Sequence, residues 1–247
     1  MSMIHRITNF WKINGATSSP KFIFRKPEDV FDYPAALEIN KARLANLDTL
    51  GIAFRGKSVI DIGCGIGHLA GYFTAKNCPV LCVDGRKENI RILKSRYPQL
   101  PARVIDIERS SLRGLKKFDI VFCYGLLYHT ENPALVLERM CKLCKDILLI
   151  ETVICDYDKP LVRFEEETTA VNQSLTTLAC RPTINFIRLK LEKSGFRYLY
   201  TPKILPDYPD FKFKFKNNLE FSDKEALHRK IFIAAKSKIR AKGIMPL

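Results

Sequence analysis

The stretch Ser58-Val-Ile-Asp-Ile-Gly-Cys-Gly-Ile-Gly67 decides how the rest of the chain is organised. Its first half is apolar and β-branched, which is typical of a strand buried on both faces of a parallel sheet. Asp61 lies near the end of this strand, and Gly63, Gly65 and Gly67 follow before the sequence becomes helical. Strand, glycine loop and helix together form the ligand crevice of an open α/β sheet, because glycine lets a ligand approach the bare backbone.

A second predicted strand, 79–84, ends in Asp84, about twenty residues after the loop, where a carboxylate can accept hydrogen bonds from both hydroxyls of a ribose. A phosphate-cradling loop is excluded, because no Gly-Lys-Ser/Thr follows the glycines. A dinucleotide loop, which would indicate a nicotinamide-dependent dehydrogenase, is disfavoured because His68 stands where a small residue is needed. The loop and Asp84 together therefore favour a ribose-bearing ligand of another kind.

The rest of the chain alternates strands and helices, which favours a mostly parallel sheet with helices on both faces. Further strands are expected at 102–106, 118–124, 147–151, 198–200 and 230–235, and helices at 35–50, 68–76, 87–96, 134–143 and 183–193. Asn132 is expected to cap the helix over 134–143, and Pro133 to occupy its first position.

The domain organisation predicted from this pattern has two parts. Residues 1–55 form an N-terminal helical appendage, which is either a packing helix or a lid, and residues 56–247 form the main domain. Two lid-like insertions, 152–182 and 202–229, follow strands five and six. Within the second, Phe and Lys alternate over 211–216, which predicts either an edge strand or a basic strip that grips phosphates.

The composition indicates which binding partners and which cellular compartment to expect. The 247 residues carry a net charge of +15, which favours anionic partners such as RNA, phosphorylated or carboxylated metabolites, or a membrane surface. No apolar run reaches the ~18 residues of a transmembrane segment, and no signal peptide is evident, so we expect a cytoplasmic protein. The eight cysteines are expected to be reduced, and Cys141 and Cys144 lack the second pair that a zinc site needs.

From about residue 56 to residue 236 the sequence resembles the class I S-adenosylmethionine (SAM) methyltransferases, through the glycine loop and Asp84. The resemblance implies a Rossmann-like seven-stranded sheet in the order 3-2-1-4-5-7-6, whose last strand is antiparallel. It also implies SAM as cofactor and S-adenosylhomocysteine as product. The segments 124–133 and 148–152 are similar to a narrower branch, which includes enzymes that modify 5-hydroxyuridine at the tRNA wobble position and many small-molecule relatives.

The resemblance also implies which residues bind each part of SAM. Asp61, Gly63, Cys64, Gly65 and Gly67 would border the methionine part, Asp84 and Gly85 the ribose, Asp106 and Ile107 the adenine, and Tyr124 and Gly125 would lie beneath the sulfonium.

The candidate catalytic residues follow strand four. His129 is the candidate general base, because an imidazole exchanges protons near neutral pH, and Tyr128 is a candidate hydrogen-bond partner of the acceptor. The alternative is that His129 is a structural residue that links this loop to the next helix. For the acceptor, Asn172, Gln173 and Arg181 are candidate contacts, of which Arg181 would suit a carboxylate or phosphate. We interpret Glu165–Glu167 as a solvated charge run and expect no metal site.

These observations favour a SAM-dependent methyltransferase that acts on an oxygen of a small anionic or sugar-like metabolite. Two alternatives stay open. One is an RNA-modifying methyltransferase that uses the basic strips, and the other is a non-catalytic protein that binds SAM.

Overall fold

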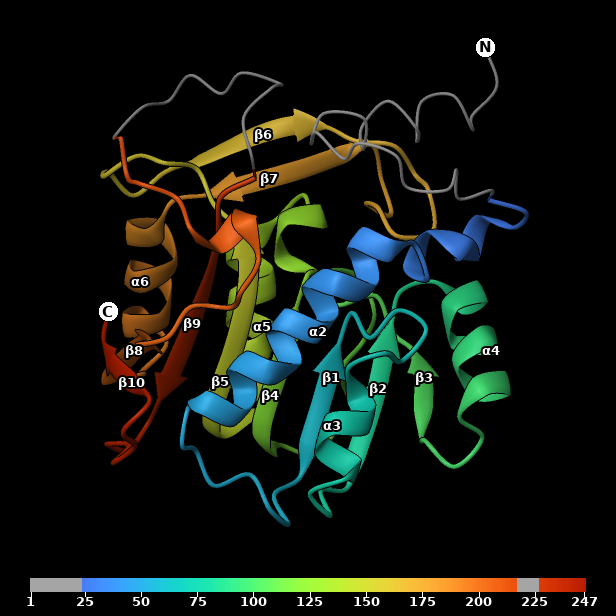
Figure 1. Ribbon diagram of the computed structural model, residues 1–247, viewed down its shortest axis with the longest axis horizontal. Helices are drawn as coiled ribbons and strands as arrows, with labels where there is room; N and C mark the ends of the chain where they lie inside the picture. Colours follow the sequence, from blue (N-terminus) through green and yellow to red (C-terminus); the bar gives the residue numbers. More distant parts are fainter. Residues whose placement is uncertain (1–23, 217–226) are drawn as a thin grey trace.

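The central sheet is the element that positions the site. The fold is that of a computed structural model, which describes residues 24–216 and 227–247 (Figure 1). Within these residues the sheet has eight strands, which are β1 (Val59–Ile62), β2 (Val80–Asp84), β3 (Ala102–Val104), β4 (Phe118–Tyr124), β5 (Cys144–Val153), β8 (Tyr198–Pro202), β9 (Arg229–Ala235) and β10 (Ile244–Pro246). A separate hairpin consists of β6 (Val162–Glu166) and β7 (Leu178–Pro182).

The strand order confirms the predicted topology. Strands β1 to β5 pair in parallel in the order β5-β4-β1-β2-β3, and β9 is inserted antiparallel between β5 and β8. With β8 and β9 counted as strands six and seven, this is the order 3-2-1-4-5-7-6. One strand, β10, which the sequence does not predict, pairs with the outer edge of β8. The mostly parallel, Rossmann-like α/β fold is therefore confirmed with one additional strand.

The parallel register brings the carboxyl ends of the strands to one edge. Asp84 at the end of β2 pairs with Val104 at the end of β3, and Tyr124 at the end of β4 pairs with Glu151 near the end of β5. Ligands of open α/β sheets bind at this edge. The residues that follow β1, β2, β3, β4 and β5 therefore share one crevice.

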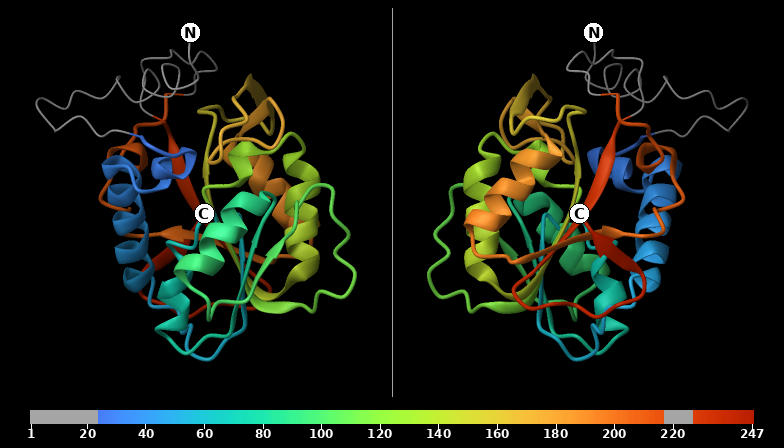
Figure 2. Two further views of the ribbon diagram at one scale, coloured as in Figure 1. Left: turned by 90° about the vertical axis from the view of Figure 1, so that its right-hand side faces the viewer. Right: turned by 90° about the vertical axis from the view of Figure 1, so that its left-hand side faces the viewer.

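Helices cover both faces of the sheet. They are η1 (Pro27–Phe31), α2 (Pro34–Thr49), α3 (Ala70–Thr74), α4 (Lys87–Arg96), η2 (Leu127–His129), α5 (Pro133–Leu143), α6 (Ile184–Lys193) and η3 (Pro209–Phe211). Buried residues of α2, α3 and α4 pack on one face, and those of α5 and α6 pack on the other. The side views of Figure 2 show α2 on one side of the sheet and α5 and α6 on the opposite side. As predicted, Asn132 caps α5, by accepting from the Leu135 backbone N–H at 3.0 Å, and Pro133 begins it.

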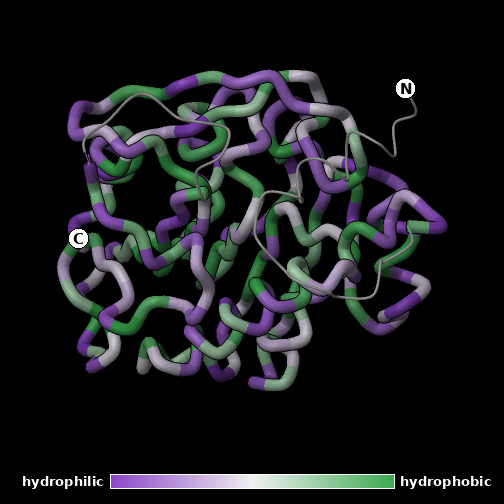
Figure 3. Tube along the Cα trace, turned by 45° about the horizontal axis from the view of Figure 1, so that its top comes forward, coloured by the Kyte–Doolittle hydropathy of each residue, from purple (hydrophilic) through white to green (hydrophobic). Residues whose placement is uncertain are grey.

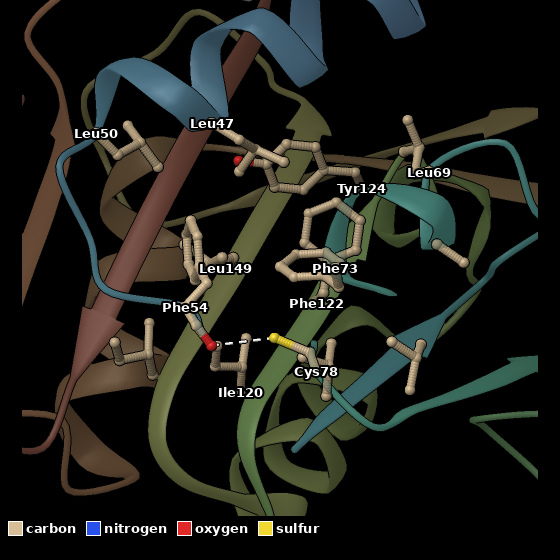
Figure 4. Packing of buried hydrophobic residues seen from close by; sticks show 14 of the residues in the cluster. Leu47, Leu50, Phe54, Leu69, Phe73, Cys78, Ile120, Phe122, Tyr124 and Leu149 are labelled. Atoms are coloured by element: carbon tan, nitrogen blue, oxygen red, sulfur yellow. Dashed lines mark hydrogen bonds between the residues drawn. The ribbon is translucent and has the colours of Figure 1, made fainter. Parts of the chain in front are cut away.

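The α2 face of the sheet has an aromatic core. Phe73 of α3 meets Phe122 of β4 edge-on, with ring centroids 4.9 Å apart, and Phe122 lies 4.3 Å from Tyr124. Leu47 and Leu50 cover these rings from α2 and its end (Figure 4). Figure 3 colours the chain by hydropathy and shows that apolar and polar stretches alternate along it. Burying one such side chain stabilises the fold by about 1.5–3 kcal/mol, so α2 is held firmly on the sheet.

Several predicted element boundaries are wrong. The alternating residues 211–216 form no strand: η3 ends at Phe211 and no regular structure follows to Lys216. The lid-like insertion 152–182 contains two strands where none is predicted, the β6–β7 hairpin, which crosses the upper part of the view in Figure 1. Strand β3 ends at Val104, so Asp106 lies in the following turn, and β5 begins as early as Cys144.

The remaining expectations concern the ends of the chain and its thiols. The first 23 residues of the predicted appendage lie outside the described residues, and its boundary at residue 55 stays a prediction. All eight cysteine thiols are free. Across 24–216 and 227–247, none of the helices combines the length and the apolar character that crossing a bilayer requires.

Candidate active site

The glycine loop after β1 is held against β2 by backbone hydrogen bonds. The backbone N–H groups of Gly63 and Cys64 donate to the Val83 carbonyl at 2.8 and 3.1 Å. Gly65 has a φ of 53°, and a Cβ there would stand 3.0 Å from the Phe31 ring. Only glycine therefore fits this turn without displacing its neighbour.

Asp84 is buried at the end of β2 with most of its acceptor positions in use. One carboxylate oxygen, Oδ2, accepts from the Gly65 backbone N–H at 3.0 Å, and Oδ1 accepts from the Arg86 backbone N–H at 2.8 Å and from the Asn89 side chain at 3.2 Å. Burial raises the pKa of Asp84, although the hydrogen bonds from Arg86 and Gly65 oppose this shift. Since a carboxylate oxygen can accept two hydrogen bonds, Oδ2 retains one acceptor position.

Asp61 lies next to Asp84 and lacks a partner for one oxygen. Its side chain is 2% exposed, and among the described residues Oδ2 has no hydrogen-bond partner. Burial, together with the charge of Asp84, raises the pKa of Asp61 to about 7. Two buried carboxyl groups side by side are unfavourable unless a cation compensates them. This end of the crevice therefore suits a positively charged ligand that carries hydrogen-bond donors.

The other candidate cofactor residues follow β2, β3 and β4 at the same edge. A Cβ at Gly85 would stand 2.5 Å from Leu175, so the segment between β6 and β7 lies directly on this glycine. Asp106 turns its carboxylate toward the backbone N–H groups of residues 108 and 109, and Ile107 is buried. Gly125 donates its backbone N–H to the Glu151 carbonyl at 3.0 Å, and the buried Tyr124 hydroxyl has no hydrogen-bond partner within the described ranges.

His129 forms a pair with a carboxylate that the sequence does not reveal. Its Nδ1 lies 2.6 Å from Glu167 Oε2, and the two side chains are 9% and 11% exposed. Burial lowers the pKa of His129, although Glu167 opposes the shift. Because a carboxylate only accepts, a neutral His129 carries its proton on Nδ1, and the lone pair is on Nε2. The predicted alternative, a link to the next helix, is not the contact seen, since the partner comes from the segment after β6.

Tyr128 lies between two arginines. Its hydroxyl accepts from Arg229 Nη2 at 3.3 Å, and the guanidinium carbons of Arg229 and Arg181 lie 4.9 and 5.5 Å from its ring centroid. Arg181 also donates to the Tyr128 carbonyl at 3.2 Å and pairs with Glu165 at 2.9 Å. The structure thus places Arg181 beside the two candidate catalytic residues.

The other two candidate acceptor contacts lie elsewhere. The backbone carbonyl of Gln173 accepts from Arg86 Nη2 at 3.3 Å, and Asn89 donates to the carbonyl of Val171. Asn172, between these two residues, and Gln173 therefore lie beside the Asp84 corner, apart from Arg181. Whether any of the three contacts an acceptor stays a prediction.

The interpretation of residues 165–167 as a solvated charge run is wrong for two of them. Glu165 pairs with Arg163 and Arg181, and Glu167 pairs with His129 and accepts from the Ser174 backbone N–H. Only Glu166 is exposed. Across the described residues, no group of His, Cys, Asp and Glu side chains has the arrangement that a metal ion needs.

A buried ionic network that the sequence does not reveal connects α2 to the end of β5. Glu151 is fully buried and pairs with Arg43 of α2 at 2.5 Å and with Arg229 of β9 at 3.1 Å. A Cβ at Gly125 would stand 3.3 Å from the Arg43 guanidinium, so this network borders the end of β4. The signal that could have identified it is an acidic residue, Glu151, directly after the apolar run 147–150.

Comparisons with known proteins identify the family of the chain and several of its relatives. A family model described as "Methyltransferase domain" matches residues 34–201. The chain is 30% identical over 113 residues to the ubiquinone biosynthesis O-methyltransferase of Paracidovorax citrulli, which covers 44% of this chain and 47% of that protein. It is 29% identical over 151 residues to the tRNA U34 carboxymethyltransferase of Azotobacter vinelandii, which covers 58% and 46%. The chain thus spans about half the length of the curated relatives it matches.

Solved structures support the same fold. The N-terminal domain of EvdMO1, crystallised in the presence of S-adenosylhomocysteine and D-fucose, superimposes with a TM-score of 0.60 at 16% sequence identity. The match covers 95% of this chain and 97% of that domain. At 16% identity this likeness shows that the two proteins share an arrangement of helices and strands. The chemistry has to be argued from the residues of the site.

Proposed function

Since the chain belongs to the methyltransferase domain family, we propose that it transfers the methyl group of SAM to an oxygen of a small anionic or sugar-like metabolite. The observation that carries the proposal is the pair of buried carboxyl groups, Asp61 and Asp84, beside the glycine loop. SAM, when bound, supplies a methyl group activated by a sulfonium. Its positive charge and its ammonium and hydroxyl donors fit the unpaired oxygen of Asp61 and the remaining acceptor position of Asp84.

The chain's own residues then bind and orient the reactants. Methyl transfer is an in-line displacement, so holding the acceptor in the right position contributes much of the rate. His129 accepts the proton of the acceptor hydroxyl on Nε2, because burial lowers its pKa and keeps the ring neutral at pH 7. Glu167 fixes the orientation of the ring through Nδ1. Tyr128, held by Arg229 through its hydroxyl, is a hydrogen-bonding group beside this base.

A second candidate function is methyl or related transfer to RNA. It is favoured by the similarity to proteins named tRNA U34 carboxymethyltransferase and by the net charge of +15. Lys212, Lys214 and Lys216 are exposed on one segment and would contact phosphates. This function predicts that affinity for RNA falls steeply with salt concentration.

One experiment separates these functions. The protein is incubated with methyl-tritiated SAM and either total RNA or a protein-free metabolite extract, and both S-adenosylhomocysteine formation and the labelled product are measured. Label in an alkali-stable metabolite supports the first proposal, and label in RNA supports the second. If neither fraction yields S-adenosylhomocysteine while the protein still binds it, the protein is a non-catalytic SAM-binding protein and the proposed activity is wrong.

A further inference from the structure

A cavity outside the SAM crevice lies beside the first residues of β9. Strand β8 pairs with β9 only at residues 233–235, so residues 229–232 have no register partner in β8. The segment that follows β8, including η3, passes along this part of β9 (Figure 1). Together with the start of α6 it encloses a cavity of about 220 Å³.

The walls of this cavity are mainly apolar, and three of the lining residues are phenylalanines. Phe211, Phe213 and Phe215 all line it, although this segment forms no strand. Phe211 is buried, and Phe213 stacks on the His228 ring with centroids 4.3 Å apart. Phe215 is 46% exposed and therefore lies where the cavity meets solvent. Such walls suit a flat, apolar ligand.

One of the two cationic residues that line the cavity has no counter-ion among the described residues. Lys230 lines it and is partly buried, and among residues 24–216 and 227–247 its ammonium group has no hydrogen-bond or ion-pair partner. Burial lowers the pKa of Lys230, as expected for an uncompensated ammonium. Arg229, the other cation in the wall, is satisfied by Asp210 and Glu151, each at 3.1 Å. Lys230 is therefore the group that an anionic ligand would neutralise.

The cavity adjoins the candidate catalytic residues through a shared wall. Arg229 lines it, and the same guanidinium donates to the Tyr128 hydroxyl at 3.3 Å. A ligand in the cavity would thus lie one side chain away from the Tyr128–His129 pair. Its volume is larger than the ~150 Å³ that holds a benzene molecule and smaller than the ~300 Å³ at which sites for drug-sized ligands begin. One substituted ring or two fused rings would fit.

Building on the proposed function, we propose that this cavity binds the ring of a small aromatic carboxylic acid, whose carboxylate pairs with the Lys230 ammonium. The cavity would then hold the acceptor, or the part of it that carries the acid group, beside Tyr128. The acceptor expected from this proposal is an aromatic carboxylic acid, which is one class of the anionic metabolites proposed above.

The test compares two probes that differ in charge. Binding of 2-naphthoate and of neutral 2-naphthalenemethanol to the full chain is measured by titration calorimetry and saturation-transfer NMR. A charge-assisted hydrogen bond in a partly buried site is worth a preference on the order of 10- to 100-fold for the carboxylate. In Lys230→Met the preference should disappear while the affinity for the neutral probe stays the same. Phe213→Ala should weaken both probes.

Lys214→Met is the matched control, because Lys214 is exposed, belongs to the same segment and does not line the cavity. It should retain the full preference for 2-naphthoate. Affinity for S-adenosylhomocysteine and the melting temperature are measured for every variant, so that loss of the cofactor site or of the fold is recognised separately. Equal binding of the two probes, no binding of either, or an unchanged preference in Lys230→Met overturns the proposal. The proposal is also wrong if a short RNA displaces 2-naphthoate and does so to different extents in wild type and in Lys214→Met. That result would assign this surface to RNA.

Discussion

Replacing Glu151 by glutamine should destabilise the protein more than any change to a surface ion pair. Each carboxylate oxygen of Glu151 faces a different arginine, with Oε2 toward Arg43 and Oε1 toward Arg229. An amide has only one oxygen, so one buried guanidinium would face an N–H₂ group instead of an acceptor. Breaking a buried pair from one side costs about 3–5 kcal/mol. For a chain of this size that lowers the melting temperature by roughly 6–20 °C.

The assay is urea unfolding followed by far-ultraviolet circular dichroism, with Asp146→Asn as control. Asp146 pairs with Lys57 at 2.8 Å, but the two side chains are 37% and 32% exposed. Such surface pairs contribute about 0–1 kcal/mol. A loss below 1 kcal/mol for Glu151→Gln, or equal losses for the two variants, would refute the view that this network fastens α2 to the sheet.

The pH dependence of stability gives an independent check on Glu151. Burial alone would raise the pKa of Glu151, but Arg43 and Arg229 outweigh it, so that the pKa lies below its ordinary value of 4.5. A carboxylate with a lowered pKa stabilises the folded state above the unfolded pKa, and this contribution is lost as the pH falls through the folded pKa. Wild type should therefore lose stability below pH 4.5 more steeply than Glu151→Gln.

Three further predictions test other parts of the structure. His129→Ala should lower the rate of methyl transfer by about 10²- to 10⁴-fold while S-adenosylhomocysteine still binds. In wild type the rate should fall on the acid side below pH 6.5, because only neutral His129 accepts a proton. Full turnover in the variant would contradict the role of His129 as base. Gly243→Ala should destabilise the protein by about 1–3 kcal/mol, because the new Cβ would stand 1.7 Å from the last carbonyl of α2. Gly71→Ala should stabilise it by about 0.5–1 kcal/mol, because this position on α3 faces open space. Similar urea midpoints for the two variants would contradict this contrast. Asp61→Asn should raise the melting temperature at pH 8, because a carboxyl group whose pKa is raised to about 7 opposes folding once it ionises. The same variant should bind S-adenosylhomocysteine more weakly. An unchanged melting temperature together with an unchanged affinity would contradict the charge argument.

The fold was predictable where its signals are local. A buried strand, a glycine loop and a helix follow one another within residues 58–76, and the acidic end of the next strand comes soon after. These neighbours in sequence are also neighbours in the sheet, since β1 pairs with β2. The family resemblance, which the family model confirms, then supplied the strand order.

The errors arose where a local pattern lacked a partner. Alternation over 211–216 has the period of a strand, but this segment pairs with no strand of the sheet, and its phenylalanines line a cavity instead. The hairpin of β6 and β7 was missed for the opposite reason: β6 is short and rich in charged residues, and its partner follows a long connection.

The candidate site was predictable only in part, because its contacts join distant segments. Asp84 and the glycine loop were identified from spacing alone. Glu167 reaches His129 across 38 residues, and Arg43 reaches Glu151 across 108. A single sequence offers no signal for such pairings beyond the presence of a charged residue in an apolar stretch, so they required the three-dimensional arrangement.

Titration calorimetry of S-adenosylhomocysteine tests the central claim most directly, with wild type, Asp84→Ala and the control Asp146→Asn, whose carboxylate lies near the opposite end of the sheet. We predict that wild type and the control bind alike. Asp84→Ala should bind at least about 100-fold more weakly while it remains folded, because it loses a buried acceptor for the ribose hydroxyls. Undiminished affinity in Asp84→Ala, or no binding by wild type, would contradict the assignment of this crevice to SAM.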